Sequence, residues 1–511
     1  MDFYSDIPWT AVPLLAVGTV LSLLGERTTQ RVCGGLGLAS LLAAWGCALW
    51  QVAAVTRPAS PIEIATVWGA LIYGLYGGLV FVQSPCDRSV GGRGWGGMLL
   101  AVAGVVCLSA STLPVVYLGF NLLTIGLHWH LADGVTTEQR KRIAAAFRFH
   151  QACLLMTLLG MVVLYGICGT LTINEMTAIG ALKNPTVRAS GLALLAAVAL
   201  LTGLCGYATS AVLQREESSA AIAVKEVLPP AAALIVLLRL VPPVLPELST
   251  LIEAATVTAA AVVLVIAAWK TWTSARLTSL ISGLVLLQFS MWLIGLAVGV
   301  WDSAHVARSL TFVSGLPGGL AAATIGLCVD GLACLGLAGV LGVIHRGGRS
   351  MEFVDDFCGL LQRRPVAAGA AIVCLASLCG LPPTPGFWFR WWSLVAAVSP
   401  QHTSQLTGLY QPHMGFLLCC GLLLAGWFLA IYFSLRLFGA IILDEPRGRF
   451  EFGRAWLAGL SVGPVCVAVL MLGIRPGLLV RFAMETESVP TAEVEALPGS
   501  SDRPDEVQRP N

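Results

Sequence analysis

Long apolar stretches recur along almost the whole chain, and they restrict its fold more than any other feature. The length of each stretch is close to that of a helix that crosses the hydrocarbon core of a bilayer, about 20 residues. Short segments with Pro, Gly and charged residues separate them. Fourteen such runs lie near residues 8–24, 32–55, 62–83, 95–111, 113–132, 147–170, 189–213, 221–242, 250–269, 277–300, 313–344, 366–397, 415–441 and 455–476. They predict an all-α polytopic membrane protein with about 14 transmembrane helices.

The composition excludes an ordinary soluble protein. Of the 511 residues, 57% are hydrophobic and only 11% are charged, whereas a soluble domain is roughly 25% charged. A globule in water needs more polar covering than this chain offers. The net charge of +2 gives no reason to expect a nucleic-acid partner. The lipid bilayer is therefore the expected surrounding medium.

Basic residues are distributed unequally between alternate loops. If the N-terminus lies outside the cytoplasm, the cytoplasmic loops hold eighteen Lys and Arg residues, Lys270 among them, and the outer loops hold four. This asymmetry follows the positive-inside rule. It predicts a multi-pass protein of the inner (plasma) membrane with both termini outside the cytoplasm.

One apolar run is interrupted. The run near 366–397 contains Pro382, Pro383 and Pro385, and inside lipid such a break is tolerated only where protein or water pairs with the freed carbonyls. A discontinuous helix is therefore expected here. A tight turn is expected at 109–114, and residues 477–511 are expected to form an acidic, disordered tail.

Ionisable residues inside apolar runs are the candidates for function, because each costs roughly 2.5–3.5 kcal/mol to insert. The candidates for a proton path are Lys225, Glu226, Asp330, Arg390, His128 and His130. A lysine beside a carboxylate can load and release a proton when their pairing changes. An arginine stays protonated, so Arg390 would act as a fixed charge.

Each candidate also has a structural interpretation. Arg239 and Glu253 are expected to snorkel towards the interface. His128 and His130, two residues apart and so on different faces of a helix, can simply mark its hydrated end. Function is favoured for the deeper Asp330 and Arg390. For Lys225 and Glu226, function and helix–helix pairing are balanced.

No cofactor or metal site is predicted. The fifteen cysteines lie mostly in apolar runs without a CxxC pair, which is typical of small buried hydrophobic residues. There is no P-loop, and no GxGxxG follows a strand. We therefore expect no metal, nucleotide, flavin or iron–sulfur cluster on this chain, and no catalytic residue.

Several motifs in the second half resemble those of a known family. They are SLCGLPPTPGF at 377–387, FVDDFCGLLQRRP at 353–365 and YFSLRLFGAIILDEP at 432–446. In this order they resemble the antiporter-like (Mrp-type) membrane subunits of respiratory complex I, most closely subunit N of bacterial NADH-quinone oxidoreductase. YLGFNLL at 117–123 and LYGICGTLTINE at 164–175 are fainter matches. The resemblance implies N-terminal transmembrane helices at 1–110, an antiporter-like proton-translocating domain at 111–476 and the tail at 477–511.

The resemblance also implies a proton-translocating axis, from which this sequence departs. In the family the axis consists of a glutamate in the fifth helix and lysines in the seventh, eighth and twelfth. The matching positions here are Asn121, Tyr207, Pro230 and Arg390. Three titratable groups are lost and the fourth becomes a fixed charge. Lys225 stands about 7.5 Å along a helix from Pro230, so Lys225 and Glu226 are possible replacements; the alternative is that the path is lost.

The function implied is that of a membrane-arm subunit of a complex I-like NADH-quinone oxidoreductase. It would contribute to proton translocation coupled to quinone reduction, or support it structurally, beside other membrane-arm subunits. NADH, FMN, iron–sulfur clusters and quinone would bind elsewhere in the assembly, so this chain would not be catalytic alone. The alternatives are a degenerate structural subunit, a cation/proton antiporter subunit and, less well supported, a solute transporter.

Overall fold

The structure is a computed structural model of the whole chain. The residues it describes are 3–24, 30–53, 92–132, 137–173, 175–176, 191–209, 219–244, 249–273, 275–306, 318–346, 349–350, 353–398, 414–443, 451–452 and 455–478.

Helices make up nearly all of the described chain. The first half contains α1 (Phe3–Leu24), α2 (Gln30–Ala53), α5 (Gly92–Cys107), α6 (Leu113–Leu131), α7 (Thr137–Cys168), α10 (Leu192–Thr209) and α11 (Ser219–Val244). The second half contains α12 (Ser249–Thr273), α13 (Leu277–Val306), α14 (Gly319–Val343), η5 (Val354–Phe357), α15 (Leu360–Arg363), α16 (Pro365–Cys379), α17 (Pro385–Val398), α18 (Met414–Ile442) and α19 (Ala455–Ile474).

Three very short strands form a small antiparallel sheet at one end of the bundle. They are β1 (Ile344–Arg346), β2 (Arg349–Ser350) and β3 (Glu451–Phe452), in the order β2-β1-β3. His345 pairs with Ser350 on one side and with Glu451 on the other. The sheet therefore ties the segment after α14 to the segment that leads into α19.

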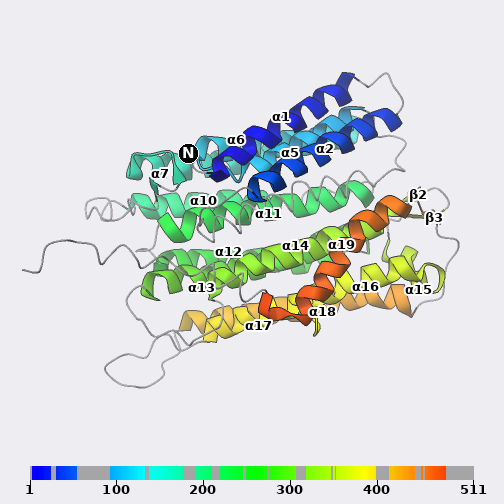
Figure 1. Cartoon of the computed structure of the whole chain (residues 1–511). Coiled ribbons are helices and arrows are strands. Elements are labelled where there is room, and N and C mark those ends of the chain that lie inside the picture. The colour runs from blue at the N-terminus through cyan, green and yellow to red at the C-terminus, as the bar shows by residue number, and fades with distance from the viewer. Residues whose placement is uncertain are drawn as a thin grey trace, which may run out of the picture.

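The long helices lie side by side with their axes roughly aligned (Figure 1). From α1 to α18 the chain passes from one edge of this layer to the other, with α11 to α14 in the middle. The helix α19 returns to pack on α14, α16 and α17. Elements from both halves of the chain therefore meet at α11, which contacts α10, α13 and α14.

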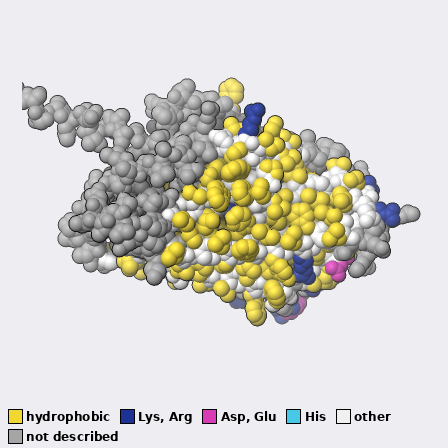
Figure 2. Space-filling view, turned by 90° about the horizontal axis from the view of Figure 1, so that it is seen from below, with side chains coloured by type: hydrophobic (Ala, Val, Ile, Leu, Met, Phe, Trp, Pro, Cys, Tyr) yellow, Lys and Arg dark blue, Asp and Glu magenta, His cyan; other side chains and the backbone are white. Residues whose placement is uncertain are grey.

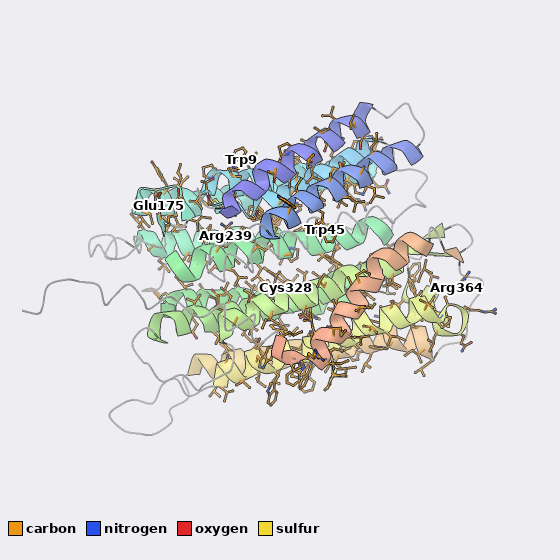
Figure 3. All side chains as sticks on the ribbon, viewed as in Figure 1. Trp9, Trp45, Glu175, Arg239, Cys328 and Arg364 are labelled. Carbon is orange, nitrogen blue, oxygen red and sulfur yellow. The ribbon has the colours of Figure 1, made fainter. Side chains whose placement is uncertain are left out.

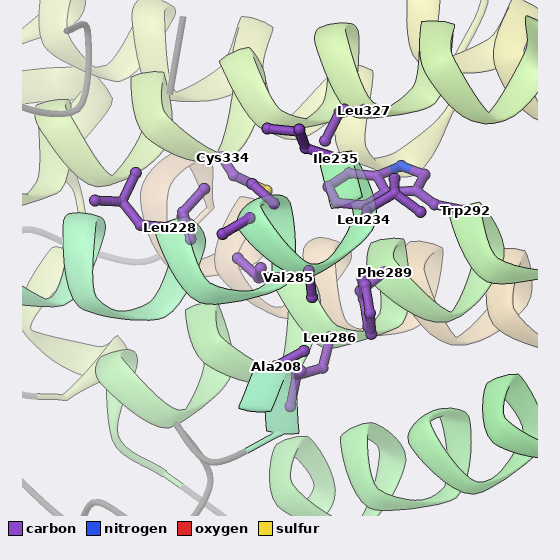
Figure 4. Close-up of a cluster of buried hydrophobic side chains, with 14 of the residues drawn as sticks. Ala208, Leu228, Leu234, Ile235, Val285, Leu286, Phe289, Trp292, Leu327 and Cys334 are labelled. Atoms are coloured by element: carbon purple, nitrogen blue, oxygen red, sulfur yellow. The ribbon is translucent and has the colours of Figure 1, made fainter. Parts of the chain in front are cut away.

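The core is built where α11, α13 and α14 meet. Leu234 and Ile235 of α11 lie beside Phe289 and Trp292 of α13 and Leu327 of α14, all of them buried (Figure 4). The apolar window of α13 is entirely buried within the chain. A helix that is apolar on all sides and surrounded by other helices is the central element of such a bundle.

The outer surface is apolar, as expected of a protein in lipid. Val262, Val265 and Trp269 of α12 are exposed, and Phe428 and Leu435 of α18 are exposed as well. The face shown in Figure 2 is covered mostly by hydrophobic side chains, with Lys and Arg near its margins. Among the described residues, six helices are long and apolar enough to cross a membrane, as judged by length and composition.

The helix boundaries confirm much of what the apolar runs predict. The run near 366–397 is divided into α16 and α17, and α6 begins at Leu113 after the expected turn. The run near 62–83 and nearly all of the tail at 477–511 lie outside the described residues. The number of fourteen spans and the domain boundaries therefore remain predictions.

Two helices of the first half approach each other through glycine. A Cβ atom on Gly104 of α5 would overlap the backbone of Leu123, and one on Gly126 of α6 would overlap the backbone of Ala101. Small residues permit such close backbone contact between membrane helices. This contact fixes α6, which carries His128, against α5.

Replacing Gly104 by valine is therefore expected to separate α5 from α6. Overpacking of a tight contact costs about 1–3 kcal/mol, which should appear as a lower free energy of unfolding in mixed micelles. Gly421→Val in α18 is the matched control, because a Cβ there meets nothing within 4 Å. Equal stability of the two variants would contradict the close contact.

Candidate functional site

The break between α16 and α17 lies in the interior of the second half. Gly380, which follows α16, has a left-handed backbone with φ of 66°, a conformation that glycine adopts without steric cost. A side chain at Gly380 would also press on Arg390 and Trp427. The last carbonyls of α16 have no helical N–H partner and need another donor.

Arg390 of α17 supplies donors for two of these carbonyls. Its Nη1 donates to the carbonyls of Gly386 (2.6 Å) and Ser377 (3.3 Å), and its Nη2 donates to the carbonyl of Leu378 (2.7 Å). Nη2 also donates to Oε1 of Gln288 on α13 at 2.6 Å. The guanidinium is 2% exposed. It therefore closes the end of α16 and links the break to α13.

Asp330 of α14 provides the opposite charge. Its Oδ2 lies 3.4 Å from Nη2 of Arg390, and both side chains are fully buried. Neither Asp330 oxygen makes a hydrogen bond of good geometry with a described residue, although the Trp292 indole lies close enough to interact. Because arginine does not release its proton in proteins, Arg390 is a fixed positive charge in this pair.

A second buried ion pair joins α11 to α12. Oε2 of Glu226 lies 4.0 Å from Nζ of Lys270, and the two side chains are 6% and 9% exposed. Lys270 also donates a hydrogen bond to the Ser282 hydroxyl on α13. Both members can change protonation, unlike the pair at the break. This arrangement can therefore take up, hold and release a proton.

A third polar group lies between α6, α7 and α10. The Tyr207 hydroxyl is 3.0 Å from Oγ1 of Thr124, and its ring meets that of His150 at a centroid distance of 4.9 Å. His150 in turn meets His128 edge-to-face, with ring centroids 4.8 Å apart. All four side chains are buried. The group brings two imidazoles and two hydroxyls together inside the bundle.

The described residues contain no group of three or more His, Cys, Asp or Glu side chains arranged to hold a metal ion. Three pairs of charged or titratable side chains occur instead among the described buried residues: Glu226 with Lys270, Asp330 with Arg390, and His128 with His150. Pairs of this kind suit the exchange of protons better than the binding of a cofactor.

A sequence model of the family described as "NADH:quinone oxidoreductase/Mrp antiporter, TM" matches residues 110–409, more than half of the chain. The chain belongs to this family. The match includes α6 to α17 and therefore all three buried groups.

Solved structures share the fold of this antiporter-like family member. A chain of respiratory complex I from Thermus thermophilus superposes with a TM-score of 0.68 over 92% of this chain and 98% of that one, at 19% sequence identity. A chain of the Mrp complex from Dietzia sp. DQ12-45-1b gives 0.68 over 95% and 97%, at 16% identity. The archaeal membrane-bound sulfane sulfur reductase gives 0.71 over 93% and 77%, at 16% identity.

Curated relatives match over shorter stretches. NADH-quinone oxidoreductase subunit N 2 of Roseiflexus castenholzii is 33% identical over 144 residues, which are 28% of this chain and 26% of that protein. Subunit N of Acidithiobacillus ferrooxidans is 31% identical over 176 residues, or 34% and 33% of the two chains. The matches span a quarter to a third of the relatives' length. They confirm the resemblance to subunit N, within that part.

Three positions matched to the family's proton-translocating axis lie inside the bundle but carry neither the glutamate nor the lysines of the family. Asn121 is half-buried, and its Nδ2 donates to the Tyr117 carbonyl one turn earlier. Tyr207 is fully buried beside Thr124. Pro230 lies in the buried part of α11. The tyrosine thus lies against the histidine group, and the buried acid–base pair is found one turn before Pro230.

Two expected surface residues prove to be buried. Arg239 and Glu253 were predicted to snorkel, but they are only 6% and 4% exposed. Arg239 lies on α11 (Figure 3), and its Nη1 donates to the carbonyl of Leu108, which follows the end of α5, at 2.5 Å. It therefore caps a helix end, as Arg390 does. Oε1 of Glu253 has no hydrogen-bond partner among the described residues.

The two remaining proton-path candidates, His130 and Lys225, are not shown in contact with the buried groups described above. His130 is buried on α6 but lies two residues beyond His128. Lys225 belongs to α11 by its backbone, while its side chain lies outside the described residues. Glu226 thus has Lys270 as its described partner, and a contribution of Lys225 remains a hypothesis.

Three residues of these groups were not predicted from the sequence as site residues: Lys270, Gln288 and His150. Lys270 was counted with the cytoplasmic loop, yet it lies in the last turn of α12 and is almost buried. His150 directly follows a strongly polar stretch, so it was not counted among the ionisable residues inside an apolar run. Gln288 was not considered because only ionisable residues were taken as candidates. A search for every polar residue within four positions of an apolar run would have found all three.

Proposed function

We propose that this chain is a membrane-arm subunit of a complex I-like NADH-quinone oxidoreductase, and that it contributes to proton translocation coupled to quinone reduction. The observation that carries the proposal is the buried Glu226–Lys270 pair within a chain of the antiporter-like family. The Glu226–Lys270 pair is the element that exchanges the proton, and Arg390 is a fixed charge beside the broken helix.

The chemistry of the first pair suits a reversible proton site. Glu226 and Lys270 are 4.0 Å apart, so they attract each other without a direct hydrogen bond. Ser282 accepts from the lysine and holds Nζ in place when the carboxylate is protonated. A proton can therefore enter on Glu226 and leave again when Lys270 moves closer.

The electrostatic interaction energy of such a pair is comparable to the free energy needed to move a proton across the membrane. Two unit charges 4 Å apart interact by about 4 kcal/mol at an effective dielectric constant of about 20. Moving one charge across 100 mV requires about 2.3 kcal/mol. Loosening or tightening this one pair can thus supply enough free energy to drive a proton against a membrane potential of that order.

The other parts of the proposal concern the assembly. The chain would sit in the inner (plasma) membrane beside other membrane-arm subunits, with both termini outside the cytoplasm. NADH, FMN, iron–sulfur clusters and quinone would bind to other subunits. The likeness of its fold to chains of multi-subunit respiratory and Mrp complexes supports this placement.

Two other functions have a specific observation in their favour. Asn121, Tyr207 and Pro230 at the axis positions favour a structural subunit that moves no proton. The similarity to a chain of an Mrp complex favours a cation/proton antiporter subunit. The buried pair argues against the first, because titratable charges inside a membrane-spanning bundle are costly to insert and usually mark a functional site.

Glu226→Gln is the variant that tests the proposal, because glutamine keeps the size of the side chain and binds no proton. In vesicles containing the whole assembly, the number of protons moved per NADH oxidised is expected to fall while electron transfer continues. Glu138→Gln is the matched control. Glu138 also lies 4.0 Å from a lysine, Lys141, but that pair is exposed.

Three outcomes separate the functions. A lower proton yield in Glu226→Gln alone supports translocation through this chain. An unchanged yield supports the structural subunit. Proton movement that requires Na⁺ or K⁺ on the opposite side, without NADH, supports the antiporter.

A further inference from the structure

We propose that His128 and His150 form a second proton-holding site, one that holds a single proton between α6 and α7. The site is distinct from the Glu226–Lys270 pair. Its existence does not depend on the proposed function; only the use of its proton for translocation does.

Hydrogen bonds to the backbone fix the tautomer of both rings. Nδ1 of His128 lies 2.7 Å from the carbonyl of Thr124, and Nδ1 of His150 lies 3.0 Å from the carbonyl of Ala146. A carbonyl only accepts, so each Nδ1 carries a hydrogen. In the neutral rings Nε2 therefore bears the lone pair and is the atom that takes up a proton.

The neighbouring hydroxyls are oriented in the same way. Oγ1 of Thr124 donates to the carbonyl of Phe120 at 2.7 Å, so in the contact with Tyr207 it can only accept. Tyr207 therefore donates its proton to Thr124, and its oxygen keeps lone pairs that can accept. The Tyr207 ring lies edge-to-face with the His150 ring, at a centroid distance of 4.9 Å.

The arrangement limits the site to one proton. The ring centroids of His128 and His150 are 4.8 Å apart, and the two side chains are 6% and 3% exposed. Two imidazolium ions at this distance would repel strongly in a medium that screens charges poorly. Uptake forms one N–H bond at Nε2 of one ring and breaks one O–H bond of the hydronium ion that delivers the proton; release to water reverses both changes.

The charged side chains of α7 itself, which are Glu138, Arg140, Lys141, Arg142 and Arg148, are exposed. Phe147 packs against His128 from α7, and α10 offers Cys205 and Tyr207 as its titratable groups. The described side chains of α5 include no charged residue, and those of α11, which also contacts α6, include Glu226 and Arg239. The titratable group next to Tyr207 on α7 is the Cys153 thiol.

Proton counting on the purified full-length chain in lipid nanodiscs tests the proposal directly. Protons bound between about pH 8 and about pH 5 are titrated for the wild type, His128→Gln, His150→Gln and the double variant. Each single variant is expected to keep the site's proton on the remaining ring. The double variant is expected to lose about one proton per chain, as for two coupled groups that share a site.

Other counts overturn the proposal. Independent histidines would lose about one proton in each single variant and about two in the double variant. Histidines that only fill space would lose none. His128→Phe/His150→Phe is a second double variant in case the glutamines fail to fold.

The same variants in vesicles show whether the proton is used. Loss of proton movement together with the bound proton ties the site to translocation. If the wild-type assembly moves no protons, the proposed function fails while the proton count on the isolated chain still decides the histidine site.

Discussion

Replacing Arg390 by methionine is expected to lower the free energy of unfolding by about 3–5 kcal/mol, the usual result of removing one member of a buried ion pair. The change leaves the Asp330 carboxylate buried without a counter-charge. It also removes one of the two donors to the carbonyl of Ser377 and one of the two to that of Leu378, at the end of α16. Unfolding in mixed micelles, followed by tryptophan fluorescence, measures the loss.

Two further variants divide this loss into its parts. Arg390→Met/Asp330→Asn removes both charges, so any stability that it regains is the cost of the uncompensated carboxylate. Arg390→Lys keeps the charge but lacks the planar fork that reaches several acceptors, and an intermediate stability is expected. Arg363→Met is the control, since Arg363 is exposed on α15 and its loss should stay within about 0.5 kcal/mol. An Arg390→Met variant as stable as this control would show that the contacts at the break contribute little.

The membrane helices could be predicted from the sequence because hydrocarbon imposes a length and a polarity on each of them. The break between α16 and α17 could also be predicted, since prolines within an apolar run leave carbonyls without donors. What satisfies those carbonyls could not. Arg390 appeared as a fixed charge, but its bonds to Gln288 of α13 depend on how α13 packs, and no local pattern encodes that.

The buried pairs were predictable only as single residues. Glu226 stands out as a charge within an apolar run, whereas its partner Lys270 lies 44 positions later at the end of another helix. A lysine at a helix end is normally solvated, so its position suggested a loop. Burial there arises because α13 packs on α11 and α12. His150 was hidden for a related reason: α7 is polar at its start, and the contact with His128 arises only when α6 packs beside it.

Removing both members of the Glu226–Lys270 pair separates the two main functions most sharply. Glu226→Gln/Lys270→Met leaves no uncompensated charge, and neutral replacement of a complete buried pair usually costs little stability or none. The double variant should therefore fold and assemble like the wild type, whereas Lys270→Met alone should lose about 3–5 kcal/mol. Coupled proton movement should nevertheless disappear from this chain, since no proton-exchanging group remains at the pair.

In vesicles that contain the complex, the extent of assembly and the proton yield can be measured on the same sample. The exposed pair Glu138–Lys141, changed in the same way to Gln and Met, corrects for the loss of two charges as such. Full assembly with a reduced proton yield would mean that the pair takes part in proton translocation and does not act through packing alone. Full assembly with an undiminished yield would mean that the chain serves as a scaffold. The buried charges would then be retained for helix–helix specificity, a role that ionic pairs fulfil in some bundles.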